Sequence, residues 1–513
     1  DVVGSGTQIG EGASLDDHVF ISNKSILGPG CQINSNVKIW PEKVVDAGAV
    51  VNSSLVWGDK WERELFTDSR VTGLANFELR PEFGAKLGTA FGTWLGKGNL
   101  VVMSRASTPA ARMLDRSIIC GLMSAGVHVH DLRVMPIPIV RYILRSGKDR
   151  GGIHVRRSPF DKKLLDILFF DSYGRDFSPT TTKAIERIFF REDFPLVSFD
   201  EVGDIDYPVR VSEAYVQDFL NHVDIEAIGA ARLKVVIDYS YGAATQVFPT
   251  ILGSLDCEVI SLNAFLRPEK LTRTAGEFGR ALRQLSKIVT STGADIGFLI
   301  DAGAEKIFCV DENGQIIPSE RLAILMTKLY FATNHPQKIA VPVSIPSQVE
   351  ILAKEHKIEI VHTGDDDGSI IKSTEDSAVN YAVGTSGGFI FTDFHFAFDG
   401  MFSVVRILEL MAKTGYRLGK LNDQIPKRAL ITATVPCPWE AKGQIMRQMA
   451  EYSEGKNRLL IDGVKIFTNG DWVLVIPDRE RAFCHVVAEA RNATKAKKLV
   501  ETFTAKVLKW GTS

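Results

Sequence analysis

The chain has 513 residues, of which 45% are hydrophobic and 24% are charged. This composition is typical of a globular protein and excludes a largely disordered chain, and the length is sufficient for three or more domains. The 60 basic and 62 acidic residues give a formal net charge of −2, which argues against a protein that binds nucleic acid through phosphate contacts.

Membrane and disulfide signals are missing from the sequence. No apolar run approaches the roughly 20 residues that a helix needs to cross a bilayer. The six cysteines lie far apart and form no C-x-x-C pair, which disfavours a zinc site or a disulfide framework. We therefore expect a cytoplasmic protein that does not contact membranes.

The amino-terminal segment carries an apolar side chain at every sixth position. The ten positions are Val3, Ile9, Leu15, Ile21, Leu27, Ile33, Ile39, Val45, Val51 and Trp57. This spacing suits a coil of three short strands with one apolar side chain of each strand inside, whereas the strands of a sandwich would alternate with a period of two. The pattern resembles the hexapeptide repeat of left-handed parallel β-helices, and we predict such a helix over residues 1–62.

The repeat begins in mid-coil, without the atypical repeat that caps a stack. Either another part of the protein precedes residue 1 or the chain was cut there. In families with this repeat, the helix often follows a sugar nucleotidyltransferase domain, so we expect such a domain upstream and a homo-oligomer formed through the β-helix. An acyltransferase site would need a histidine base between coils, and the segment offers only His18.

The remainder of the chain alternates apolar strands with amphipathic helices. Strand patterns begin at residues 100, 233, 296 and 338, and each is followed by a helical pattern. This alternation predicts parallel, doubly wound α/β sheets, and the stretch from residue 425 onward reads as an α+β module. We predict four domains over residues 63–228, 229–335, 336–424 and 425–513.

Several longer stretches share the letters of one enzyme family. They are LGTAFGTWLGKGNLVV, SAGVHVHDLRVMPIPIV, GGIHV and FFDSYGRDFS in the first domain, ADIGFLIDAGAEKIFCVDENG in the second, GGFIFTDFHFAFDG in the third, and VPCPWEAKG and WVLVIPD in the fourth. In this order they resemble the α-D-phosphohexomutase family, which includes phosphomannomutases and phosphoglucomutases. The resemblance implies that a phosphoryl group moves between a serine and either end of a hexose phosphate, assisted by a divalent cation.

The serine loop (residues 156–161) corresponds to the family's T-A-S-H-N-P. The resemblance places the nucleophile at Ser158, while Pro159 and Phe160 replace the flanking His and Asn. Arg156 and Arg157 could bind a phosphate or a phosphorylated Ser158, or they could form a solvated pair.

The metal loop (residues 301–306) corresponds to the family's D-x-D-x-D-R. The resemblance assigns the Mg²⁺ ligands to Asp301 and Glu305, but Gly303 replaces the middle carboxylate. Because Mg²⁺ demands octahedral oxygen ligation, we expect weak or no metal binding. Lys306 could replace part of the missing charge, and it is also a candidate phosphate-binding residue. Alternatively, the loop only ends a strand.

The sugar loop (residues 383–388) corresponds to the family's G-E-x-S-G-H. Glycines stand at the glutamate and histidine positions, and Thr385 and Ser386 could still donate to sugar hydroxyls.

The phosphate loop (residues 476–482) corresponds to the family's R-P-S-G-T-E-P. Asp478 and Glu480 bring negative charge to this loop, so phosphate binding would depend on Arg479 and Arg481. Both arginines could instead pair with those acids.

Two functional hypotheses follow from these substitutions. The first is a degenerate phosphohexomutase-like module joined to the β-helix of an enzyme resembling mannose-1-phosphate guanylyltransferases, with a structural or regulatory role and a sugar phosphate or nucleotide sugar as ligand. The alternative is an active phosphomannomutase or phosphoglucomutase that works through a phosphoserine at Ser158 and uses Mg²⁺.

Overall fold

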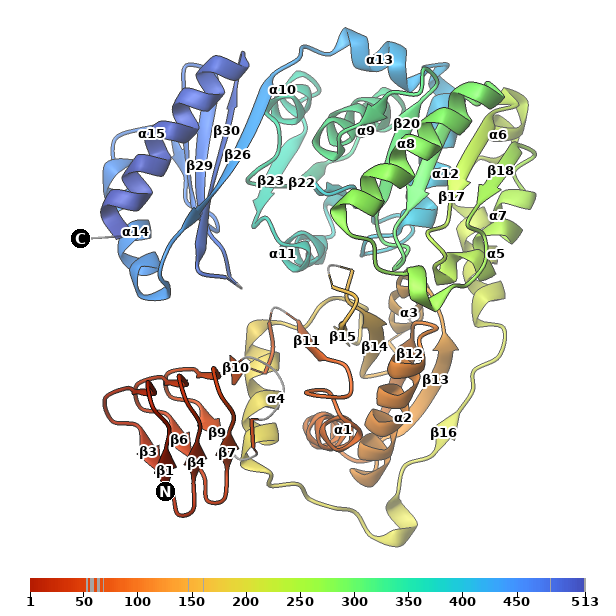
Figure 1. Cartoon of the computed structure of the whole chain (residues 1–513). Coiled ribbons are helices and arrows are strands. Elements are labelled where there is room, and N and C mark those ends of the chain that lie inside the picture. Colours follow the sequence, from red (N-terminus) through yellow and green to blue (C-terminus); the bar gives the residue numbers. More distant parts are fainter. Residues whose placement is uncertain are drawn as a thin grey trace. The chain divides into compact units, whose positions relative to one another are not determined.

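The computed structural model in Figure 1 describes most of the chain. The described residues are 1–51, 54–55, 60–61, 65–67, 69–145, 147–159, 161–479 and 481–511. Trp57, Phe160, Glu480 and the predicted boundary at residue 62 lie outside them. No described helix is long and apolar enough to cross a membrane.

The chain forms two compact units, and each is described by itself. The first unit consists of Asp1–Val134, Gly147–Ser172 and Phe177–Pro208. The second consists of Met135–Ser146, Tyr173–Asp176 and Val209–Ser513. The predicted domain boundaries are not tested by this division and stay predictions.

The first unit begins with ten two-residue strands, of which the first nine repeat every six residues. They are β1 (Val2–Val3), β2 (Gln8–Ile9), β3 (Ser14–Leu15), β4 (Phe20–Ile21), β5 (Ile26–Leu27), β6 (Gln32–Ile33), β7 (Lys38–Ile39), β8 (Val44–Val45), β9 (Val50–Val51) and β10 (Lys60–Trp61). From β1 to β6 each strand pairs in parallel with the third strand after it, and β10 pairs in parallel with β8, giving the sheets β1-β4-β7, β10-β8-β5-β2 and β3-β6-β9. One coil takes 18 residues, as the pairing of Val2 with Phe20 shows. Three parallel sheets of this kind are consistent with the predicted β-helix.

The six-residue apolar positions form the interior of these coils. Ile21, Leu27 and Ile33 are fully buried, as is each later described position of the repeat. Val3 and Ile9, which the repeat also predicts inside, are exposed. They belong to the first coil, which has a described neighbouring coil on one side only.

The second part of the first unit is a six-stranded mixed sheet with helices. The strands are β11 (Arg70–Leu74), β12 (Leu100–Arg105), β13 (His128–Val134), β14 (Gly151–Arg157), β15 (Leu164–Asp171) and β16 (Ile205–Asp206), in the order β11-β15-β14-β12-β13-β16. The helices are α1 (Pro81–Leu95), α2 (Pro109–Ser124), α4 (Pro179–Arg191) and the 3₁₀ turn Phe199–Glu201. A Cβ on Gly88 of α1 would lie 2.1 Å from the backbone oxygen of Ile118 in α2, so this glycine permits the close approach of the two helices.

The second unit contains two further α/β sheets. The first, ordered β18-β17-β19-β20-β21, has β17 (Lys234–Asp238), β18 (Glu258–Leu262), β19 (Ile296–Ile300), β20 (Ile307–Asp311) and β21 (Ile316–Ile317). The next, ordered β23-β22-β24-β25, has β22 (Lys338–Pro342), β23 (Glu359–Thr363), β24 (Val379–Val383) and β25 (Phe389–Phe391). One continuous apolar core joins the two sheets to the helices between them.

The helices of these sheets follow the predicted alternation. They are α3 (Ile137–Leu144), α5 (Val211–Asn221), α6 (Ile225–Ala231), α7 (Phe248–Gly253), α8 (Ala275–Thr292), α9 (Ser319–Thr333), α10 (Ser347–Glu355), α11 (Asp367–Lys372), α12 (Gly400–Thr414) and α13 (Leu418–Gln424), with 3₁₀ turns at Ala243–Gln246, Pro268–Lys270 and Ser373–Glu375.

The carboxyl-terminal part is the predicted α+β module. Its antiparallel sheet, ordered β26-β30-β29-β28-β27, has β26 (Ala429–Pro436), β27 (Arg458–Leu459), β28 (Val464–Thr468), β29 (Asp471–Pro477) and β30 (Phe483–Ala490). Helices α14 (Trp439–Tyr452) and α15 (Ala493–Gly511) pack against one face of this sheet (Figure 1).

The sequence predicted parallel α/β sheets, but all three α/β sheets are mixed. Each contains an antiparallel hairpin next to its parallel strands: β14–β15, β19–β20 and β24–β25. A hairpin turn needs only a few residues, so the strand-helix alternation that predicted parallel sheets could not reveal it.

Candidate functional site

The four predicted loops occupy equivalent places in their sheets. The serine loop joins β14 to β15, the metal loop joins β19 to β20, and the sugar loop joins β24 to β25. The phosphate loop joins β29 to β30 in the antiparallel sheet. Each loop is thus a hairpin turn at the ends of two neighbouring strands, where rigid strands position its side chains.

Ser158 is the first residue after β14 and its side chain is buried. Its backbone N–H donates to the oxygen of Leu164 at 3.0 Å, which closes the turn. Arg156 lies opposite Asp166 in the ladder, and its Nε is 3.4 Å from Asp166 Oδ2. Arg157 follows Arg156 as the last residue of β14. The phosphate-binding role of both arginines stays a prediction.

Asp301 builds the turn of the metal loop. Its Oδ1 accepts hydrogen bonds from the backbone N–H groups of Glu305 at 2.8 Å and Lys306 at 2.7 Å. Its Oδ2 accepts a third from Gly303 at 3.1 Å. The carboxylate therefore shapes the loop through the backbone.

Glu305 is paired with a buried arginine. Both Nε and Nη2 of Arg141, on α3, lie 3.2 Å from Glu305 Oε1. The same guanidinium donates to Asp176 Oδ1 and to the backbone oxygen of Gly174, each at 2.9 Å. Burial lowers the pKa of Arg141, but Asp176 and Glu305 outweigh that effect and the pKa lies above its usual range. Arg141 is therefore a permanent cation of this loop.

The metal loop does not offer the ligand set of a Mg²⁺ site. The oxygens of Asp301 accept three backbone N–H groups, Oε1 of Glu305 accepts from Arg141, and Gly303 has no side chain to contribute. Among the described residues, no group of three or more His, Cys, Asp or Glu side chains is placed to hold a metal ion. These residues do not fit the cation that the resemblance implies, because Mg²⁺ requires several oxygens that converge on one point.

Lys306 completes the metal loop as a second cation. Its Nζ lies 2.7 Å from Asp367 Oδ2, at the start of α11. Burial would lower the pKa of Lys306, but the carboxylates of Asp367, Glu305 and Asp301 raise it overall. The side chain is thus charged and held in place.

The sugar loop lies against the metal loop. The backbone N–H of Ile307 donates to the oxygen of Gly387 at 3.0 Å. Gly387 has φ +91°, and a Cβ there would lie 2.3 Å from the backbone oxygen of Ile307. The side chain of Thr385 is half-buried and that of Ser386 is exposed. The structure therefore brings these two candidate residues close to the metal loop.

The phosphate loop uses its acid internally. Asp478 Oδ1 accepts from the backbone N–H of Arg481 at 2.9 Å, and its Oδ2 lies 3.0 Å from Nε2 of His485. Arg479 extends to Asp366, at 3.3 Å, and to Asp462, at 2.6 Å. The carboxylate of Asp478, which the sequence analysis expected to oppose a phosphate, therefore accepts hydrogen bonds within its own loop and from β30.

Helix α11 connects two of the loops in the second unit. Asp366, its N-cap, accepts from Arg479, and the next residue, Asp367, holds Lys306. The metal, sugar and phosphate loops belong to the second unit, and the serine loop belongs to the first.

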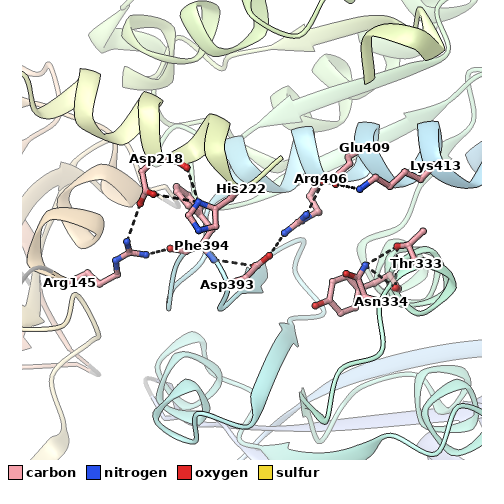
Figure 2. A network of polar contacts seen from close by, with 11 residues as sticks. Arg145, Asp218, His222, Thr333, Asn334, Asp393, Phe394, Arg406, Glu409 and Lys413 are labelled. Carbon is pink, nitrogen blue, oxygen red and sulfur yellow. Dashed lines mark hydrogen bonds and ion pairs between the residues drawn. The ribbon is translucent and has the colours of Figure 1, made fainter. Parts of the chain in front are cut away.

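A polar network around the segment after β25 was missed by the sequence analysis. Figure 2 shows Arg145 between Asp218 and the backbone oxygen of Phe394. It also shows Arg406 of α12 between Asp393 and Glu409. The spacing of Arg406, Glu409 and Lys413 by three and four residues, typical of ion pairs on one helix face, was the available signal.

Asp399 is a buried acid at the start of α12. Its Oδ1 accepts from the backbone N–H of Phe402 at 3.0 Å, and its Oδ2 accepts from the hydroxyl of Tyr215 at 2.5 Å. Burial raises the pKa of Asp399 to about 6 against these hydrogen bonds, and the charge of Glu305 adds to the rise.

Comparison with known proteins decides the family. Models of the phosphoglucomutase/phosphomannomutase α/β/α domains I, II and III match residues 63–196, 213–314 and 318–429 in chain order. The chain belongs to the α-D-phosphohexomutase family.

Individual phosphohexomutases match nearly over their whole length. A phosphoglucomutase/phosphomannomutase of Thermococcus kodakarensis is 28% identical over 444 residues, which are 85% of this chain and 97% of that protein. A phosphoglucosamine/phosphogalactosamine mutase of Sulfurisphaera tokodaii is 28% identical over 445 residues, with 85% and 97% coverage. A phosphoglucomutase/phosphomannomutase family protein from Burkholderia thailandensis shares the fold, with a TM-score of 0.75, 18% identity, and coverage of 87% of this chain and 97% of that one.

The expectation of a degenerate, non-catalytic module is wrong. The relatives matched over 97% of their length are named as mutases, which points to an active enzyme. The expectation arose because each substitution in the four loops was interpreted as the loss of a catalytic or binding group. Contacts such as those of Asp478 with Arg481 and His485 show that the charge of a loop depends on its partners as well as its letters. The predicted link to a guanylyltransferase stays a prediction.

Proposed function

We propose that this phosphohexomutase is an active enzyme that interconverts hexose 1-phosphates and 6-phosphates through a phosphoserine at Ser158. The match to a named phosphoglucomutase/phosphomannomutase over 97% of that protein's length carries this proposal. The hexose is glucose, mannose or glucosamine, the last because a relative is named as a phosphoglucosamine/phosphogalactosamine mutase.

The proposed reaction is a phosphoryl exchange. A sugar hydroxyl oxygen bonds to the phosphorus of phosphorylated Ser158, the bond from phosphorus to Oγ breaks, and the hydroxyl proton ends on Oγ. Oγ of Ser158 then bonds to the phosphorus of the other phosphate of the bisphosphate, the bond from that phosphorus to the sugar oxygen breaks, and the Oγ proton ends on the sugar oxygen, which regenerates the phosphoserine and releases the isomeric hexose phosphate. Serine suits this role because its ester splits one difficult transfer into two similar steps.

Side chains of the other loops would orient the sugar phosphate. Thr385 and Ser386 would donate to sugar hydroxyls, and Arg479 and Arg481 would bind the phosphate that does not react. The position of Arg479 between Asp366 and Asp462 supports this role, since a guanidinium fixed by two carboxylates loses little freedom when it binds a phosphate.

The amino-terminal repeat is proposed to be a left-handed β-helix through which the enzyme forms homo-oligomers. Its three parallel sheets and 18-residue coils support the β-helix. All six cysteines are free, which supports a reducing compartment such as the cytoplasm.

A coupled mutase assay tests the proposed function. Glucose, mannose and glucosamine 1-phosphates are supplied in turn with catalytic hexose 1,6-bisphosphate, with and without Mg²⁺. Turnover of at least one sugar is expected, and Ser158→Ala should abolish it while Ser291→Ala, on the exposed face of α8, leaves it unchanged. Equal rates for the Ser158→Ala protein and the natural protein, or no turnover in folded protein, would refute the proposal.

A further inference from the structure

We propose that the guanidinium of Arg141 takes the place of a divalent cation in the metal loop, so that this mutase neither binds nor requires Mg²⁺. The catalytic part of this inference rests on the proposed function. Arg141 acts here as a positioning residue, because it contacts the loop and not the reacting groups.

The first support is that the carboxylate of Asp301 already accepts hydrogen bonds from its own loop. A carboxylate has about four lone-pair sites, and three N–H groups of the loop backbone already bond to this one, at 2.7 to 3.1 Å. About one lone-pair site remains, on Oδ2, so Asp301 can offer a metal ion at most one bond unless the bonds that hold the turn between β19 and β20 are broken. The structure thus assigns Asp301 to the loop's shape.

The second support is the position of Arg141 against Glu305. Two nitrogens of the guanidinium lie 3.2 Å from the same oxygen, Oε1. The Arg141 side chain is only 4% exposed and is also fixed by Asp176 and by the backbone oxygen of Gly174. A Mg²⁺ ion on Oε1 would meet a fixed positive charge at hydrogen-bond distance, which strongly opposes binding.

The third support is that Arg141 belongs to the architecture of the loop. The backbone N–H of Ile137, at the start of α3, donates to the oxygen of Gly303 at 3.2 Å, so α3 and the metal loop are joined by backbone as well as side chain. A divalent cation commonly ties together such a loop and its neighbours. Here the guanidinium makes those connections to Glu305, Asp176 and Gly174.

Net charge alone would not exclude a cation. The carboxylates of Asp301, Glu305, Asp176 and Asp367 outnumber the two cations, Arg141 and Lys306. It is the N–H donors on the carboxylate oxygens that disfavour a coordinated metal. Removal of the guanidinium should therefore create a metal site, since Glu305 and Asp176 would then lose the cation that they share.

The test uses the full chain and two readouts. Mn²⁺ binding, measured by electron paramagnetic resonance, reports the metal directly, and the mutase assay is run in EDTA and in millimolar Mg²⁺. For the natural protein we expect no bound Mn²⁺ at millimolar concentration and equal turnover in the two buffers. Arg141→Met should bind Mn²⁺ and become stimulated several-fold by Mg²⁺, and Arg141→Lys should behave as the natural protein does.

A second substitution separates a created site from general loosening. Glu305→Gln in the Arg141→Met background should abolish the gained Mn²⁺ binding. Mn²⁺ binding by the natural protein, or turnover that EDTA abolishes and Mg²⁺ restores, would overturn the inference and leave the proposed function intact. If Arg141→Met does not fold, the natural protein alone decides, because its Mn²⁺ binding does not depend on any variant or on turnover.

Discussion

The buried acid at the start of α12 makes the stability of the second unit depend on pH. Asp399 is 3% exposed, and its pKa rises from 3.8 to about 6 in the folded protein. Asn is the neutral counterpart of the protonated acid and keeps an oxygen that accepts from the backbone N–H of Phe402. Asp399→Asn should therefore remove the titration and preserve the helix cap.

The magnitude follows from the linkage between proton binding and folding. Because the folded state holds the proton more tightly than the unfolded state, this group's contribution to the free energy of unfolding is greatest below pH 3.8 and is lost as the pH rises to about 6. A shift of this size corresponds to about 3 kcal/mol, of which roughly half is lost by pH 5. Relative to the natural protein, the free energy of unfolding of the Asn variant should rise by most of this 3 kcal/mol between pH 4 and pH 8.

Thermal and urea unfolding at pH 4.5, 6 and 8 would measure this difference, with hydrogen exchange of α12 as a local reporter. Asp193→Asn, an exposed substitution, serves as the control and should follow the natural protein at every pH. Unfolding curves of Asp399→Asn that stay parallel to the natural protein from pH 4.5 to 8 would refute the linkage argument. So would a variant that loses relative stability as the pH rises.

Three further predictions concern packing, charge and the sugar loop. Gly88→Ala should lower the free energy of unfolding by more than about 2 kcal/mol, because its Cβ would lie 2.1 Å from a backbone oxygen of α2. Gly443→Ala in α14, whose Cβ would meet no atom within 4 Å, is the control and should be neutral or stabilise by about 0.5–1 kcal/mol. Thermal denaturation measures both variants. Arg141→Met should cost about 3–5 kcal/mol, and a double-mutant cycle with Glu305→Gln should recover part of the loss; strict additivity would contradict the pairing. Gly387→Ala should raise the KM for sugar phosphate in steady-state kinetics, since its Cβ would meet the backbone that follows the metal loop at 2.3 Å; an unchanged KM would contradict the packing.

The fold could be predicted where one period dominates the sequence. The six-residue repeat gave the coils and buried positions such as Ile21 and Val51, because interior packing imposes that spacing directly. The left-handedness that the resemblance implies stays a prediction. The antiparallel hairpins were also missed, since short turns carry no helix signal between their strands.

The site could be predicted as a set of places but not as a set of contacts. Motif letters located all four loops, which the structure finds at hairpin turns. Arg141 follows a stretch that carries the family resemblance but was not singled out, because its partners Asp176 and Glu305 are 35 and 164 residues away. An ion pair between distant residues leaves no periodic signal in one sequence. For the same reason, the sequence could not show that Asp478 bonds to Arg481 and His485 within its own sheet, and its charge was expected to oppose a phosphate.

The central claim is that Ser158 carries the phosphoryl group, and mass spectrometry of the peptide that contains it tests this claim most directly. The protein is incubated with hexose 1,6-bisphosphate, digested and analysed, and a second sample receives excess hexose 1-phosphate before digestion. We expect phosphate on Ser158 in the first sample and its loss in the second. An unmodified Ser158, or phosphate that excess sugar phosphate does not remove, would contradict the account.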